Sequence, residues 1–253
     1  MVIPSKGRST TIRQHTLALF PQATVCIDEA EEAAYRRVLP EDQLLLHPNG
    51  VHSLSMIRNF IFDHVEAEVL LHAADDITGA RCEVGWRPRM IRDPQTIAEL
   101  IETTAQCCRD AGAFVFGFNQ DYMTTHLAPM QPFKLNTWVG TVMGTLAGHG
   151  LRYDEEMPFH TDVDFCLQSL LKHRIVWCDT RFVFIARKAT NVGGMASVRT
   201  AEAYRDAHRR LRAKWGQYVR IAAPPRHGKR RLRTLSTSVR VARQQELAER
   251  GLA

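Results

Sequence analysis

The sequence has few cysteines and no cysteine motif. Its 253 residues include six cysteines, and none forms a CxxC pair or a Cys/His spacing suited to zinc. This excludes a disulfide framework and a zinc module as the basis of the fold. We interpret all six as reduced core residues: Cys26, Cys82, Cys107, Cys108, Cys166 and Cys178.

Long hydrophobic runs are also missing. No stretch approaches the roughly 18 to 20 apolar residues that span a bilayer, and the N-terminus has no apolar core of a signal peptide. Internal repeats and low-complexity tracts are absent too. With 45% hydrophobic and 24% charged residues, the chain can bury one sizeable core. We therefore expect a soluble, unexported, cytoplasmic protein with no membrane partner.

Charge of neither sign dominates, but basic residues are in excess. The formal net charge is +6, which permits a polyanionic partner without identifying one. After Pro224 the chain becomes strongly basic. The candidate nucleic-acid-binding residues of that run are Lys229, Arg230, Arg231 and Arg233. The alternative is a solvated tail, because charge runs are usually exposed.

Apolar runs that alternate with helical patterns predict an α/β fold. In the first third, strands are expected near 2–4, 24–27, 43–47 and 69–77, with helices near 10–19, 29–37 and 54–64. This alternation is typical of a parallel, doubly wound sheet. Further strands are expected near 114–118, 138–145, 176–178 and 182–185, and helices near 94–111, 160–173 and 200–215.

Two adjacent acids end one of these strands. The run Val69–Ile77 contains Asp75 and Asp76 just before Thr78-Gly79, so we expect both carboxylates at the carboxyl edge of the sheet. Ligands bind at that edge in open α/β sheets, and oxygen ligands beside a phosphate suit Mg²⁺ or Mn²⁺. The pattern predicts a metal–diphosphate site. The simpler interpretation is that both acids cap the following turn.

A small basic loop follows the first strand. Ser5-Lys6-Gly7-Arg8-Ser9 lies between a predicted strand and a predicted helix, where backbone N–H groups and two cations favour a nucleotide phosphate. An ordinary turn with solvated Lys6 and Arg8 is the alternative.

The order of the motifs resembles a known enzyme class. Ile3-Pro4-Ser5-Lys6-Gly7-Arg8, Arg58-Asn59, the Asp75-Asp76 pair, Asp162-Val163-Asp164-Phe165 and Gly193-Gly194 follow one another as in GT-A nucleotide-sugar glycosyltransferases. Within that fold, residues 1 to 200 are most similar to the TET-associated glycosyltransferases of phages, thought to decorate oxidised methylcytosine in DNA.

The resemblance implies roles for individual residues. Asp76 and Asp75 would hold Mn²⁺ or Mg²⁺ against the diphosphate of a sugar nucleotide, with a UDP-sugar expected. Ala74 departs from the family's acidic run, so Asp76 would be the main ligand of the ion. An acid facing the acceptor hydroxyl would be the general base; Asp162 is the first candidate and Asp164 the second. Either acid could instead cap a helix. The donor-binding set is Pro4, Ser5, Lys6, Arg8, Asp28, Arg58, Asn59, Asp75, Gly193 and Gly194, although Gly193-Gly194 could equally be a flexible turn.

The resemblance also implies an organisation. We expect a GT-A-like mixed, mostly parallel sheet in residues 1–220, with a nucleotide-binding half at 1–80 and an acceptor half at 81–220. A basic, helical extension would follow at 221–253. The expected activity is metal-dependent sugar transfer to hydroxymethylcytosine in phage DNA, within the host cytoplasm. The competing hypotheses are a GT-A enzyme acting on a glycan or small molecule, and a non-catalytic domain that binds nucleic acid.

Overall fold

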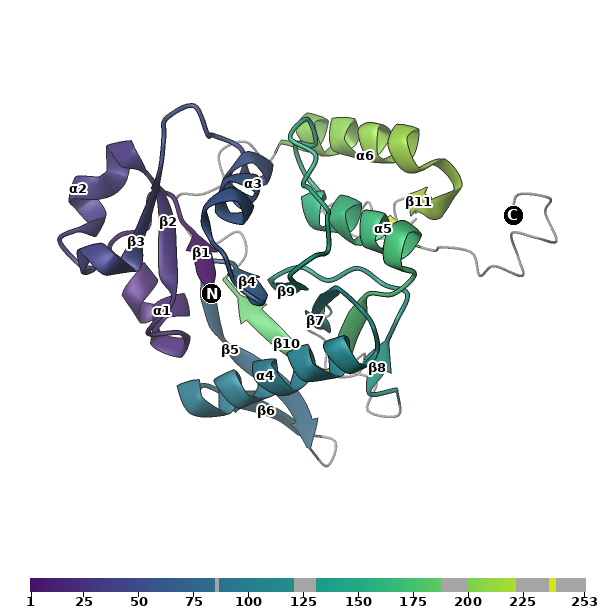
Figure 1. Cartoon of the computed structure of the whole chain (residues 1–253), viewed down its shortest axis with the longest axis horizontal. Coiled ribbons are helices and arrows are strands. Elements are labelled where there is room, and N and C mark those ends of the chain that lie inside the picture. Colours follow the sequence, from purple (N-terminus) through teal and green to yellow (C-terminus); the bar gives the residue numbers. More distant parts are fainter. Residues whose placement is uncertain (85–86, 121–130, 188–199, 222–236, 240–253) are drawn as a thin grey trace.

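A computed structural model describes residues 1–84, 87–120, 131–187, 200–221 and 237–239 of the chain (Figure 1). A mixed sheet runs through it in the order β3-β2-β1-β4-β9-β7-β10-β5-β6, with β8 paired to β10. Its strands are β1 (Val2–Pro4), β2 (Thr24–Asp28), β3 (Leu44–His47), β4 (Val69–Ala73), β5 (Ile77–Val84), β6 (Arg87–Ile91), β7 (Val115–Asn119), β8 (Phe133–Lys134), β9 (Val142–Leu146) and β10 (Trp177–Ala186).

The first four strands are parallel, which confirms the doubly wound arrangement expected for the first third. Beyond β4 the pairing changes, because β9 runs antiparallel to both β4 and β7. β10 then pairs parallel with β7 and antiparallel with β5. The carboxyl ends of β1, β2 and β4 thus share one edge of the sheet, and the acids after β4 lie there.

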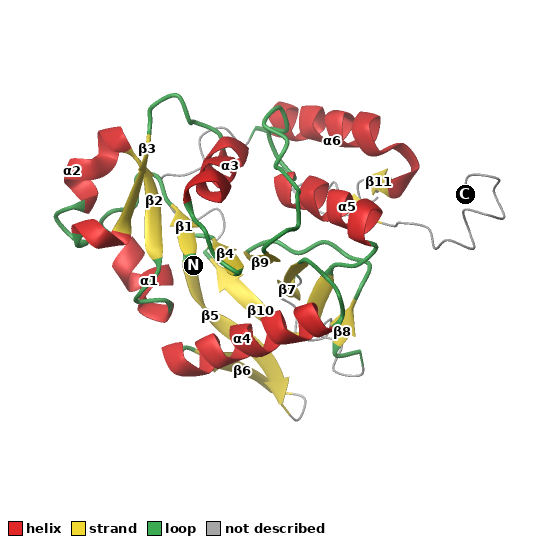
Figure 2. Cartoon of the chain, viewed as in Figure 1, coloured by secondary structure: helices red, strands yellow, loops and turns green. Residues whose placement is uncertain are grey.

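Helices cover both faces of the sheet (Figure 2). They are α1 (Thr16–Leu19), α2 (Glu32–Tyr35), α3 (Leu54–His64), α4 (Pro94–Asp110), α5 (Thr161–His173) and α6 (Ala201–Trp215), with 3-10 turns at η1 (Ile12–Gln14), η2 (Glu29–Glu31), η3 (Glu41–Gln43) and η6 (Gly216–Tyr218). Two helix starts are capped as their sequences predict. Ser53 accepts from the N–H of Met56, and Asp93 accepts from the N–H of Thr96 before Pro94.

Alternation along the strands divides the core into two sides. Ile3, Val25 and Ile27 pack with α1 and α4, whereas Val2 and Cys26 pack with α3. A third cluster joins α5 and α6 to β7, β9 and β10. Burial raises the pKa of the Cys26 thiol to about 12, as expected for an unreactive core cysteine. The six cysteines are unpaired.

Several expected elements have different limits. The strands expected at 176–178 and 182–185 form one long strand, β10, and the helices expected at 10–19 and 29–37 are each a 3-10 turn followed by one short helix. The strand expected at 138–145 begins only at Val142. In the C-terminal extension, β12 (Thr237–Val239) pairs with β11 (Val219–Ile221), so that stretch is a strand where a helix was expected.

Among the described residues, no helix combines the length and the apolar character needed to cross a bilayer.

Candidate functional site

The two acids after β4 are almost fully buried. Asp75 is 8% exposed and Asp76 is 7% exposed, at the edge where β1 and β4 end (Figure 1). The main chain around them is fixed from α1, where the hydroxyl of Thr16 donates to the carbonyl of Ala74 at 2.7 Å and accepts from the N–H of Ile77 at 2.9 Å. Thr16 thus holds the main chain on both sides of the two acids.

The loop after β1 meets these acids, as the sequence predicted. The hydroxyl of Ser5 donates to Asp75 Oδ2 at 2.8 Å, and the Arg8 guanidinium forms an ion pair with Asp75 Oδ1. Arg8 also lies 3.5 Å from Asp76 Oδ2. Behind them the Tyr35 hydroxyl accepts from the Arg8 N–H at 3.1 Å. Asp75 is therefore bonded to distant residues rather than to its own turn, which argues against the capping interpretation.

Burial and charge act against each other at Asp75. Burial raises the pKa of Asp75, and the positive charge of Arg8 and the hydrogen bond from Ser5 oppose that rise. A buried carboxylate needs such partners, because an unpaired charge is costly in a medium of low dielectric constant. The loop after β1 thus supplies the positive charge that keeps a carboxylate at this edge.

Two site residues were missed by the sequence reasoning. The backbone N–H of Arg187 donates to the Asp76 carbonyl at 3.0 Å, and Arg187 Nη1 lies 3.0 Å from His15 Nε2. Burial, followed by the charge of Arg187, lowers the pKa of His15, so its neutral ring can accept the Arg187 bond. The signal for Arg187 is its place after β10, since Ala186 is in register with Ile77. The sequence does not reveal this register, because it does not show that β10 pairs antiparallel with β5.

The two carboxylates suit a divalent ion whose coordination is completed by oxygens of a substrate. Mg²⁺ is typically bound by one or two carboxylates plus substrate phosphates. Both oxygens of Asp75 accept bonds from Ser5 and Arg8, whereas the Arg8 contact to Asp76 is longer. In the part of the chain that is described, no cluster of three or more His, Cys, Asp or Glu side chains forms a cage for a metal. Asp76 is therefore the better candidate ligand.

The other predicted donor residues lie around this edge. Pro4 is the last residue of β1, and Lys6 is exposed in the loop that follows it. Gly7 adopts φ 66° and donates its N–H to Glu31, a conformation that glycine adopts without strain. Asp28 ends β2 and caps η2 through the N–H of Ala30. These positions are compatible with nucleotide contact and do not test it.

Arg58 and Asn59 contact residues in and just before the first turn of α5. Arg58 Nη1 donates to the Thr161 hydroxyl at 3.4 Å, and its guanidinium lies 4.9 Å from the ring centre of Tyr153. The buried Asn59 amide donates to the Tyr153 carbonyl at 3.0 Å and accepts from the Tyr153 N–H at 2.9 Å. Both side chains thus tie α3 to the segment that leads into α5. Their proposed contact with the donor stays a prediction.

The candidate base Asp162 lies in the first turn of α5, half-buried. The N-cap position belongs to His160, in the left-handed region at φ 60°, so neither Asp162 nor Asp164 is the cap. A Cβ added to Gly140 would lie 2.5 Å from Asp162 Oδ2, so the carboxylate rests directly on the Gly140 backbone. The same point is 3.3 Å from Gln120 Oε1 and 3.4 Å from the Trp138 ring. The Asp162 carboxylate, the Gln120 amide and the Trp138 ring therefore all lie around Gly140.

A short connection links the two acidic centres. The N–H of Ala74 donates to the Thr141 carbonyl at 2.9 Å, and Thr141 follows the glycine beneath Asp162. The Thr141 hydroxyl also donates to Gln120 Oε1 at 3.2 Å. The segment before β9 therefore lies between the Asp75-Asp76 pair and Asp162, as a transfer reaction between two substrates requires.

The second candidate base, Asp164, has a different environment. It is 0% exposed, and it accepts bonds from Trp215 Nε1 at 2.8 Å, Lys214 Nζ at 2.8 Å and Gln168 Nε2 at 2.9 Å. These contacts favour a structural role that attaches α6 to α5. Asp162 is then the better candidate for the base.

The remaining predicted residues lie outside the described residues: Gly193, Gly194, Lys229, Arg230, Arg231 and Arg233. Nearer the site, the aromatic residues of β7 belong to the core. Phe116 and Phe118 are buried, and the Phe116 ring lies against Gly144, where an added Cβ would be 2.1 Å from its atoms.

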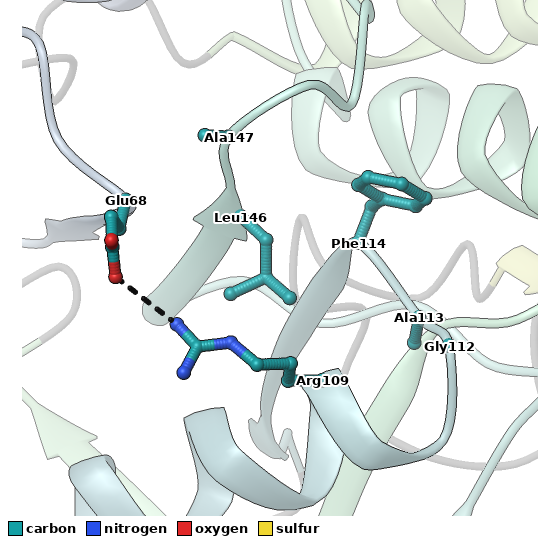
Figure 3. A pocket seen from close by; sticks show the side chains of 7 residues that line it. All are labelled: Glu68, Arg109, Gly112, Ala113, Phe114, Leu146 and Ala147. Atoms are coloured by element: carbon teal, nitrogen blue, oxygen red, sulfur yellow. Dashed lines mark ion pairs between the residues drawn. The ribbon is translucent and has the colours of Figure 1, made fainter.

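A shallow pocket of about 500 Å³ lies away from these acids (Figure 3). Glu68 and Phe114, which line it, stand before the first residues of β4 and β7 rather than after their ends. Its charged residues, Glu68 and Arg109, pair with each other at 3.5 Å. This pocket is therefore not the candidate site.

Comparison with known proteins identifies the family. The family model for TET-Associated Glycosyltransferase matches residues 1–195, more than three quarters of the chain. The chain belongs to the TET-associated glycosyltransferase family. The resemblance inferred from the motifs is thereby confirmed. No curated protein matches it.

Solved structures show the same fold at low identity. The 1-349 fragment of S. aureus TarS matches with a TM-score of 0.50 at 10% identity, over 84% of this chain and 64% of the fragment. The same fragment in complex with UDP-GlcNAc matches with a TM-score of 0.50 at 12% identity, over 84% of this chain and 65% of the fragment. A mycobacterial protein matches with a TM-score of 0.53 at 7% identity, over 94% of this chain and 82% of that protein. This chain thus spans just under two thirds of either TarS fragment, and the GT-A-like fold is confirmed.

Proposed function

We propose that this protein is a glycosyltransferase that moves a sugar from a nucleotide-sugar donor, a UDP-sugar, to hydroxymethylcytosine in DNA, with a divalent ion at Asp76. The observation that carries the proposal is the connection between the acidic centres through Thr141 and Gly140. It supports a donor and an acceptor that bind next to each other at one edge of the sheet.

The donor side is built to receive a diphosphate. When the sugar–phosphate bond breaks, negative charge develops on the departing nucleoside diphosphate, and nearby cations stabilise it. Arg8 contacts both Asp75 and Asp76, and the Arg187 backbone N–H donates to the Asp76 carbonyl, so two arginines lie close to these acids. A bound Mg²⁺ or Mn²⁺ would neutralise the same charge, held by Asp76 and, in part, Asp75. The TarS complex with UDP-GlcNAc supports a UDP-sugar as the donor.

The acceptor side supplies a base. The acceptor hydroxyl forms a new bond from its oxygen to the anomeric carbon as the bond to the diphosphate breaks, and its proton must leave. Asp162 is half-buried beside Gly140 and Gln120, and its carboxylate can accept that proton. A positioned general base typically contributes about 10²–10⁴-fold to the rate.

The family and the charge support a nucleic-acid acceptor. The matching family is named for its association with TET enzymes, and the net charge of +6 favours a polyanion. A hydroxymethyl group on cytosine projects into the major groove, or reaches a pocket when the base is flipped at a cost of a few kcal/mol. Trp138, beside Asp162, is the aromatic side chain placed to stack on such a base.

The test is a transfer assay on the purified chain. DNA containing hydroxymethylcytosine is incubated with Mn²⁺ and a panel of sugar nucleotides, then digested to nucleosides for mass measurement. The proposal predicts a mass increase of one sugar unit on hydroxymethylcytosine and none on cytosine. Transfer to saccharides alone would contradict the proposed acceptor, and DNA binding without any turnover would contradict the proposed activity.

A further inference from the structure

Helix α6 lies beyond the family match, yet it packs on the element that carries the candidate base. It spans Ala201–Trp215, whereas the family model ends at residue 195. Figure 1 shows it lying over α5. It is thus an addition to the matched domain, and its two faces differ in what they contact.

The inner face of α6 is fixed to the start of α5. The Tyr204 ring stacks on Phe159 at 4.9 Å, and the His208 ring stacks on His160 at 4.6 Å. Further along, Trp215 donates to the buried Asp164. The helix is therefore held along its length, and it cannot move far without disturbing the turn that contains Asp162.

The outer face of α6 is basic. Arg205, Arg209 and Arg212 are exposed, and their spacing of four and three residues places them on one side of the helix. Arg205 and Arg212 are seven positions apart, which is about 10 Å along the axis. Arg209 contacts Asp206 within the helix at 3.3 Å, a surface pair of the kind that contributes at most about 1 kcal/mol. Arg205 and Arg212 have no acidic partner among the described residues.

The remaining basic groups of α6 point elsewhere. Lys214 reaches Asp154 and Asp164, and Arg210 pairs with Asp206 at 2.9 Å and also reaches the Glu156 carbonyl. The outward arginines are thus a separate set, which we name the α6 arginine face: Arg205, Arg209 and Arg212.

We propose that the α6 arginine face binds the phosphate backbone of the acceptor DNA duplex and so presents its bases to Asp162. Phosphates of one strand follow each other at about 3.4 Å along the duplex axis, so a face about 10 Å long matches about three of them. Arginine suits phosphate because its planar group donates two parallel hydrogen bonds. Backbone contacts of this kind set the register of a duplex and carry no sequence information. The inference rests on the proposed function, since it assigns the surface on which that substrate lies.

The test reverses the three charges in the full-length chain. The variant Arg205→Glu, Arg209→Glu, Arg212→Glu is compared with wild type and with a control, Arg37→Glu, Arg87→Glu, Arg89→Glu, which changes the net charge equally at exposed arginines of other elements. The probe is a fluorescent duplex containing hydroxymethylcytosine, and its dissociation constant is measured by anisotropy at several salt concentrations. We expect at least about tenfold weaker binding for the α6 variant, and a salt slope reduced by about 0.9 for each phosphate that the variant no longer binds. The control should retain most of the affinity.

Two further measurements separate the outcomes. Glutamate near Arg212 is unfavourable for the helix dipole, so the glutamate variant could be less stable than wild type. A second variant therefore carries glutamine at the same three positions. The melting temperature of each protein is measured to confirm that it is folded. Wild-type affinity in the glutamine and glutamate variants, or an equal loss in the control, would overturn the proposal. So would binding to vesicles of anionic phospholipid that depends on these arginines while DNA binding does not. If DNA binding requires the α6 arginine face but no sugar is transferred, the proposed function fails, whereas the contact of this face with the DNA backbone stands.

Discussion

The substitution Gly140→Ala isolates the placement of the candidate base. Gly140 does not adopt a positive φ, so alanine is allowed by its backbone and only the added methyl group matters. That group would lie 2.5 Å from Asp162 Oδ2. A carbon–oxygen contact needs at least about 3.2 Å, so the carboxylate must move by about 0.7 Å. A misplacement near 1 Å can cost about 10²-fold in rate.

We therefore expect kcat to fall by about 10- to 100-fold in Gly140→Ala, with little change in donor affinity. The matched control is Gly50→Ala, because an added Cβ there meets nothing within 4 Å. A double-mutant cycle with Asp162→Asn provides the decisive comparison. Once the base is absent its displacement costs nothing, so Gly140→Ala should have little further effect on kcat. Unchanged kcat in the single variant, or an equal loss in both backgrounds, would refute the assignment of Asp162.

Three further predictions follow from the contacts described. Asp76→Asn should abolish transfer while the melting temperature stays near that of wild type, and a fully active variant would remove Asp76 from the site. Asp164→Asn should lower the free energy of unfolding by about 1–3 kcal/mol, because a buried network loses a charged acceptor, while kcat of the folded fraction falls far less than in Asp162→Asn. Stability should decrease with acid, because burial lowers the pKa of His149 to about 4 and its Nδ1 accepts the Leu151 N–H at 3.0 Å. The neutral ring is favoured in the folded state, so its contribution is complete above the unfolded pKa of about 6.5 and is lost as the pH falls toward 4. Urea titrations across that interval should show a shallower pH dependence for His149→Gln, and an identical dependence would contradict this cause.

Local patterns in the sequence predicted which residues gather at the edge where β1 and β4 end. Parallel strands joined by helices place their carboxyl ends together, so the loop with Ser5 and Arg8 was expected beside Asp75, and the structure brings them into contact. The acidic pair was recognisable because two carboxylates after an apolar run need a partner. These inferences use only neighbours in the chain and one rule of topology.

The rest depended on pairings between distant segments. An apolar, alternating run specifies a strand but not its partner, so nothing local placed β9 between β4 and β7 or Arg187 beside Asp76. The polar stretch Asp179–Arg181 divided β10 into two expected strands, and its register with β7 indeed shifts between Asp179 and Val183. The role of Gly140 became visible only with Asp162 resting on it.

The central claim is that the edge formed by Asp75, Asp76, Arg8 and Arg187 holds the diphosphate of the donor. A crystal structure with a UDP-sugar and Mn²⁺ tests it most directly. We predict an ion at about 2.1 Å from a carboxylate oxygen of Asp76, Arg8 and Arg187 within hydrogen-bond distance of the phosphates, and the sugar directed toward Asp162. A donor bound elsewhere, with Arg8 still paired to Asp75 and no ion at Asp76, would contradict the account.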